Sequence, residues 1–276
     1  MTAPDLPVAA GTATDAEAFD VREFARTAQG SHRSELDLDA LSGTKLPADA
    51  AHLIRILRDL ERSTMQRMRN LLVTATHKDA RVTAFLTTWA YERFWLADAL
   101  DAVLEATGEE LASPEAGKQR RSFSERAERR GPVRRAIAAG FDGTQLVAAH
   151  VTAGLVDEWV TSAAYRRLAS AASGLAGVVE LVLHVKERHI RFLSEESERR
   201  LAASPRAQRL ARRELTRSAW PIGTIEISAA DRTFFEGYVF GAGDGRAEAG
   251  RITTLIAGLP GIGTAVAGTV GGRLAP

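Results

Sequence analysis

The stretch 180-ELVLHVKERHIRF-192 predicts a long helix with one face turned toward a protein core. Val182, Val185 and His189 follow one another at intervals of three or four residues, the spacing of side chains on one side of an α-helix. A glutamate three residues before a histidine would place two metal ligands on that side. Lys186 stands where this glutamate would be. The stretch therefore predicts a buried helix whose polar residues depart from a metal-binding pattern.

Other segments have the same helical pattern, and no alternating strand pattern competes with them, so we predict an all-α chain. The boundaries of the helices are marked by residues that favour helix ends, namely Pro47, Asp79, Gly108, Thr144 and the pair Ser173-Gly174. The long helices are predicted over residues 47–77, 79–107, 144–172 and 175–203.

These helices form two pairs that are separated by one long connection, residues 108–143. Short links make antiparallel neighbours, and a long crossover lets two such pairs associate. We therefore predict a helical bundle over 47–220. Residues 1–46 would be a disordered arm with a short helix near 15–28 and a polar link, and 221–276 would be C-terminal helices and a Gly-rich tail packed on the bundle.

The composition is typical of a soluble globular protein of 276 residues, with 45% hydrophobic and 26% charged residues. The net charge of +1 gives no sign of a nucleic-acid partner, and the lack of cysteine excludes disulfides and thiolate chemistry. We find no signal-peptide pattern, and the apolar tract 252–272 is interrupted by Pro260 and several glycines, so we expect no membrane span. A cytoplasmic protein is expected, and a homodimer is left open.

Each long helix carries one titratable residue near its middle, on the face that should be buried. These residues are Glu61, Glu92, Glu158 and His189. A buried carboxylate is costly unless it is paired, protonated or bound to metal. We therefore predict that the four side chains share one internal polar site. The alternative is that they lie at four unrelated edges and reach solvent.

In these residues the chain resembles the ferritin-like superfamily of di-iron carboxylate proteins. The resemblance is carried by Glu61 and by 91-YERFWLADAL-100, 156-VDEWVTSAAYRRLA-169 and 184-HVKERHIRF-192, and it covers roughly 47–203. That family places one glutamate on each of two helices and an ExxH motif on each of the other two. The resemblance implies an antiparallel four-helix bundle with a long crossover and a di-iron site.

The ExxH motifs of that family are incomplete in this chain. On the second helix the two possible frames are Glu92-xx-Trp95 and Arg93-xx-Leu96, and on the fourth helix Lys186 replaces the glutamate. The neighbouring Glu187 lies about 100° further around the helix and would reach the site only through a bulge. The resemblance therefore implies a degenerate di-iron site. If a metal is bound, its ligands would come from Glu61, Glu92, Glu158, Glu187 and His189.

Our leading hypothesis is a metal-independent protein that needs no cofactor and binds a small apolar or amphipathic molecule, with acid–base chemistry at its site. Glu92 would be the acid or base, because the tryptophans that flank it should raise its pKa by desolvation. His189 would be its partner, Tyr165 would donate a hydrogen bond, and Lys186 would bridge two carboxylates. The alternative for Lys186 is an edge position that reaches water.

Two other functions remain open from the sequence. The first is a non-haem di-iron or Fe/Mn oxidoreductase, an oxidase or oxygenase, with an atypical ligand set. The second is a non-catalytic protein that keeps the fold for scaffolding or dimerisation. Metal content separates the first from the rest, and a filled core with no cavity beside Glu92 would argue against any substrate.

The crossover contains the basic stretch 118-KQRRSFSERAERRGPVRR-135, with eight basic and two acidic residues. We interpret it as a solvated lid helix. The functional alternative is an anchor for an anionic substrate or for the surface of a carrier protein.

Overall fold

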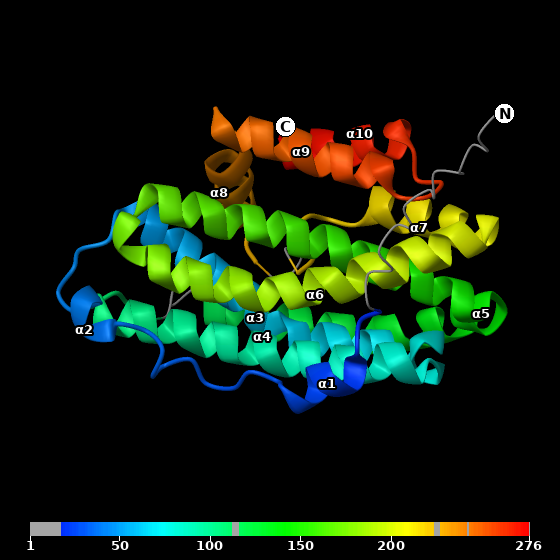
Figure 1. Cartoon of the computed structure of the whole chain (residues 1–276), viewed down its shortest axis with the longest axis horizontal. Helices are drawn as coiled ribbons and strands as arrows, with labels where there is room; N and C mark the ends of the chain where they lie inside the picture. The colour runs from blue at the N-terminus through cyan, green and yellow to red at the C-terminus, as the bar shows by residue number, and fades with distance from the viewer. Residues whose placement is uncertain (1–17, 112–115, 224–226, 242, 276) are drawn as a thin grey trace, which may run out of the picture.

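The computed structural model describes residues 18–111, 116–223, 227–241 and 243–275, with the backbone alone for 116–142 and 144. Within these ranges the chain is all-helical and contains no strand, as the sequence predicts. Long helices run side by side through the molecule, and shorter C-terminal helices cover one side of them (Figure 1). No helix of the described ranges combines the length and the apolar character that crossing a membrane requires.

The long helices are α3 (Ala48–Leu72), α4 (Ala80–Ala106), α5 (Ala116–Ala171) and α6 (Ala176–Ala203). Helices α3 and α4 form one pair, joined by the 3-10 helix η1 (Ala75–Lys78), and the second part of α5 pairs with α6 (Figure 1). The predicted helix over 47–77 therefore ends at Leu72, and its last part belongs to η1.

Helix α5 consists of two helices that meet at Gly143, where the φ angle is 42°. Before α5, the carbonyl of Leu111 accepts a hydrogen bond from Arg58 of α3. After Gly143, His150 lies 2.9 Å from Thr76 of η1, at the other end of the α3–α4 pair. The crossover therefore runs along the long helices. The basic side chains of 118–135, and Thr144, lie outside the described side chains.

The segment before α3 is more helical than predicted, because α2 (Leu38–Leu41) lies within the predicted polar link. It also contains α1 (Val21–Arg26), and α2 begins after the capping carboxylate of Asp37. Leu36 and Leu46 are buried in the common core, because this segment covers apolar surface that α4 would otherwise expose. The predicted disordered arm before the short helix near 15–28 lies outside the described residues.

The C-terminal region forms α7 (Pro205–Arg217), α8 (Ala229–Phe240), α9 (Asp244–Gly258) and α10 (Thr264–Leu274). Ser228 caps α8, since its hydroxyl accepts a hydrogen bond from the Asp231 N–H at 3.0 Å. The predicted Gly-rich tail is helix α10, which packs on α9 and α7. A Cβ atom at Gly271 would lie 2.4 Å from the hydroxyl of Thr253, so glycine permits the close approach of α9 and α10.

Asp79 begins α4 and connects it to α6, which provides a test of this arrangement. One carboxylate oxygen accepts a hydrogen bond from the Val82 N–H at 3.0 Å, and the other lies 2.5 Å from Arg200. We expect Asp79→Ala to lower the free energy of unfolding in urea by about 0.5–2 kcal/mol, the usual effect of losing an N-cap. Asp79→Asn keeps the capping acceptor and should cost less. Equal losses in the two variants would assign the effect to the ion pair instead.

Candidate functional site

The four predicted titratable residues meet in the middle of the long helices. Glu61 comes from α3, Glu92 from α4, Glu158 from α5 and His189 from α6, and each is at most 1% exposed. They meet because each helix turns its apolar stripe inward, and these residues lie within the stripes. The shared internal polar site is therefore present, and the alternative of four edge positions is wrong.

Lys186 is fully buried and lies between two of these carboxylates. Its ammonium nitrogen is 2.6 Å from Oε2 of Glu158 and 3.3 Å from Oε1 of Glu61. It also lies over the ring of Tyr165, 5.7 Å from the centroid. The bridging position predicted for Lys186 is present, and the edge position is wrong.

Arg93 is a second buried cation on the same two carboxylates. Its Nε donates a hydrogen bond to Oε2 of Glu61, and its Nη1 lies 3.4 Å from Oε1 of Glu158. Its guanidinium also covers the ring of Trp89, at 5.1 Å from the centroid. Arg93 precedes Leu96 by three residues, as Lys186 precedes His189, so the two ExxH-like frames each begin with a cation.

The charges of four groups at this centre balance. Glu61 and Glu158 are the two carboxylates, and Lys186 and Arg93 are the two cations. Burial by itself raises the pKa of Glu158, but Lys186 and Arg93 more than compensate and hold it well below its usual value. The pKa of Glu61 is lowered in the same way, against the effect of burial, chiefly by Arg93. Both glutamates are therefore ionised, and their charge is neutralised by residues of the chain.

Tyr165 completes the surroundings of Glu61. Its hydroxyl donates a hydrogen bond to Oε1 of Glu61 at 3.1 Å. The prediction that Tyr165 is a hydrogen-bond donor is therefore confirmed. Burial, together with the negative charge of Glu61, raises the pKa of Tyr165 well above its usual value. The phenol therefore stays protonated and acts as a donor.

Glu92 and His189 form a second part of the site, on the side of α1. The Nε2 atom of His189 lies 2.8 Å from Oε2 of Glu92. The other oxygen of Glu92 accepts a hydrogen bond from the Gln29 N–H at 2.9 Å and lies 3.3 Å from Arg188. The Nδ1 atom of His189 has no hydrogen-bond partner among the described residues, and Oε1 of Glu158 is 3.8 Å away.

The tryptophans that were expected to surround Glu92 make their contacts with other residues. The indole N–H of Trp89 donates a hydrogen bond to Glu158 at 2.7 Å, and Trp95 packs edge-to-face against Tyr91 and Phe94. Glu92 is instead surrounded by polar partners. Tryptophans are therefore not the partners of Glu92.

Glu187 does not reach the site. Its side chain is exposed, because α6 is a regular helix through this region and no bulge rotates the residue inward. Glu187 is thus not placed to bind a metal with Glu158 and His189.

Another buried carboxylate, that of Asp157, lies next to this network and was not predicted from the sequence. Asp157 is 1% exposed, lies 2.6 Å from Arg67 and accepts a hydrogen bond from the Ile222 N–H at 2.6 Å. No periodic signal identifies it, since it lies beside Glu158 on a different face. Arg93 was detectable, because it begins a frame equivalent to that of Lys186.

The residues present do not fit the two metal ions that the family resemblance implies. In the part of the chain that the structure describes, no group of three or more histidine and acidic side chains could hold a metal ion. The oxygens of Glu61 and Glu158 already contact Arg93 and Lys186, whose charges would repel a divalent cation.

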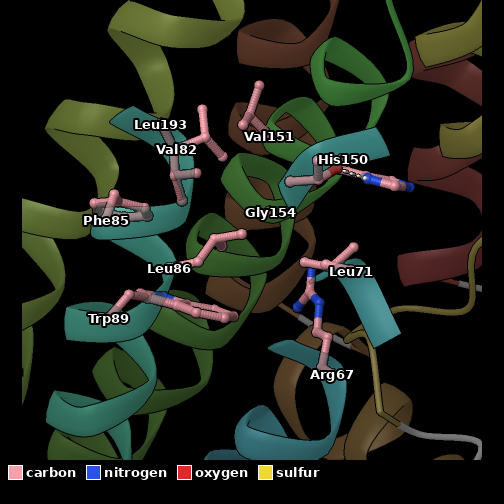
Figure 2. A pocket seen from close by; sticks show the side chains of 11 residues that line it. Arg67, Leu71, Val82, Phe85, Leu86, Trp89, His150, Val151, Gly154 and Leu193 are labelled. Atoms are coloured by element: carbon pink, nitrogen blue, oxygen red, sulfur yellow. Dashed lines mark hydrogen bonds between the residues drawn. The ribbon is translucent and has the colours of Figure 1, made fainter. Parts of the chain in front are cut away.

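A small pocket lies beside the network, between α4, α5, α6, η1 and the C-terminal end of α3 (Figure 2). It holds about 10 Å³ of space for water, roughly one molecule. It is lined by Arg67, Leu71, Thr76, Val82, Phe85, Leu86, Trp89, His150, Val151, Gly154 and Leu193. Glu92 and His189 do not line this pocket and are fully buried, so a ligand could reach them only after a segment of the chain moves. The pocket is therefore not the cavity beside Glu92 that a substrate would need.

Comparison with models of protein families, with characterised proteins and with solved structures finds no match to this chain.

The lowered pKa values predict how stability depends on pH. The folded-state pKa of Glu61 and Glu158 lies below that of an unfolded glutamate, about 4.3. Their contribution is therefore complete above this value and is lost as the pH falls toward the folded-state pKa. We expect the free energy of unfolding in urea to fall between about pH 5 and pH 3. Glu158→Gln should flatten this dependence, whereas Glu105→Gln, at an exposed ion pair, should leave it unchanged.

Proposed function

We propose that this protein is a metal-independent member of the ferritin-like superfamily that binds a small apolar or amphipathic molecule. The order of two helical pairs with a lengthwise crossover supports the ferritin-like assignment. The convergence of Glu61, Glu92, Glu158 and His189 at mid-helix supports it further.

One observation carries the metal-independent assignment, the position of the Lys186 ammonium between Glu61 and Glu158. Arg93 adds a second cation to the same carboxylates. Together the two cations supply the positive charge that buried carboxylates require. We therefore favour this function over an iron or manganese oxidoreductase.

The ligand would bind at Glu92 and His189. These two residues lie on the side of the network that faces the N-terminal segment, and Glu92 contacts Arg188, which is partly exposed. The hydrogen bond between Glu92 and His189 also favours a second, catalytic candidate function, because a carboxylate and an imidazole in contact can exchange a proton with a bound molecule. A scaffolding protein or homodimer would need neither group in this position.

Metal content tests the proposal directly. We expect protein purified from iron- and manganese-replete cells to contain neither metal in stoichiometric amounts by elemental analysis. Stoichiometric metal together with visible absorption or an EPR signal would instead support the oxidoreductase.

Substitution of Lys186 tests the role of the cation. Lys186→Glu should lower the stability of the metal-free protein by about 3–5 kcal/mol, since it removes one partner of a buried pair. The same change recreates an ExxH pair with His189, so iron or manganese should raise the melting temperature of this variant. Lys186→Met is the matched control, because it should lose stability without gaining a response to metal. An unchanged melting temperature in Lys186→Glu, with and without metal, would mean that Lys186 has no role in the site.

A triple variant makes the test stricter. Arg93→Glu and Leu96→His, added to Lys186→Glu, complete both ExxH motifs and retain Glu61 and Glu158. We expect this variant to bind two metal ions per chain, measured by elemental analysis after dialysis. If it folds and binds none, the helices do not have ferritin-like geometry.

A further inference from the structure

The N-terminal strap, residues 18–30, covers the Glu92–His189 pair with aromatic side chains. Phe24 is 3% exposed, stacks on Phe85 at 5.4 Å and meets the ring of His189 edge-on at 6.1 Å. Phe19 lies beside it, in contact with Phe85 and with Phe192 of α6. The phenyl ring of Phe24 therefore fills the space directly against the imidazole.

The strap also supplies polar groups to the same place. Its Gln29 N–H donates a hydrogen bond to Glu92 at 2.9 Å. Its carbonyl oxygens at Phe24 and Thr27 accept hydrogen bonds from Arg188, at 3.3 and 3.2 Å. The strap thus places a ring and an N–H donor against the buried pair, and carbonyl acceptors against the neighbouring Arg188.

The strap is held in place by tertiary contacts, with Phe19, Val21 and Phe24 buried in the core, so a ligand that reaches the pair must displace it. Its helix α1 has six residues, too few to be stable without packing. Opening would leave Glu92 without its backbone donor and Arg188 without the acceptors that the strap supplies, in a recess bordered by Phe85 and Phe192. A buried carboxylate that has lost a donor is costly, so a molecule that offers the same groups would be favoured there.

We propose that the strap occupies a ligand-binding site, and that the ligand is a neutral aromatic amide or a compound with the same groups. This inference rests on the proposed function and specifies its ligand class. The aromatic ring would replace Phe24, the N–H would donate to Glu92, and the carbonyl would accept from Arg188. A neutral ligand is favoured over an aromatic carboxylate because the charge of Arg188 is already matched by Glu92, 3.3 Å away.

Benzamide is a suitable probe, and full-length Phe24→Ala is the first variant. Removing the ring should let benzamide bind at least tenfold more tightly than it binds the wild-type protein, measured by calorimetry, because the ligand no longer competes with Phe24. Phe24→Leu is a milder variant if the alanine change prevents folding. Phe235→Ala, an equal truncation at a buried position in α8, is the matched control and should gain no binding.

The predicted polar contacts of the ligand are tested in the Phe24→Ala variant. Benzamide should bind Phe24→Ala more tightly than toluene or benzoate, and adding Glu92→Gln should weaken benzamide about tenfold, the loss of one charged hydrogen bond. Equal binding of toluene and benzamide, without an effect of Glu92→Gln, would show only an apolar void and overturn the proposal.

Hydrogen exchange of the wild-type protein separates this inference from the proposed function. Saturating benzamide should speed exchange at the Gln29 amide, because the strap is displaced. If benzamide binds without any change at Gln29, ligand binding stands and the strap site is rejected. If neither the wild-type protein nor the Phe24 variants bind any probe, the strap site is rejected, and the metal content decides the proposed function separately.

Discussion

The ion pairs of Lys186 with Glu61 and Glu158 are the constraint on which the interior of this protein depends. Two carboxylates are held away from water, where an unpaired charge is expensive, so the cations of the chain must lie within contact distance of both. Arg93 meets the same requirement from α4. The apolar stripes bring the helices together, but the charges decide which residues must face one another.

Much of this arrangement can be predicted from the sequence, because helical periodicity indicates which side chains are buried. A glutamate or histidine within an apolar stripe has to enter the core, and Lys186 was predictable from its place three residues before His189. Contacts set by side-chain orientation were not predictable. The indole of Trp89 turns toward Glu158 and away from Glu92, and the burial of Phe24 depends on a segment that has no long helical pattern.

The network differs from a metal centre in how its charge is supplied. A metal ion can be lost or exchanged, whereas Lys186 and Arg93 are part of the chain. They also place donors at defined oxygens, while Tyr165 and Trp89 donate to the same two glutamates. Buried carboxylates that are satisfied in this way rigidify the helices around them, which leaves the Glu92–His189 side, where Nδ1 of His189 has no partner among the described residues, as the part that can change.

The pairing pattern also determines how the two helical pairs align. Each cation contacts one glutamate of its own pair and one of the other pair, since Arg93 reaches Glu158 and Lys186 reaches Glu61. If one pair slid past the other by a single helical turn, about 5.4 Å, both cross-pair contacts would break at once. The network therefore fixes the axial alignment of the two helical pairs. A misaligned packing that the apolar stripes alone would allow would separate the charged partners.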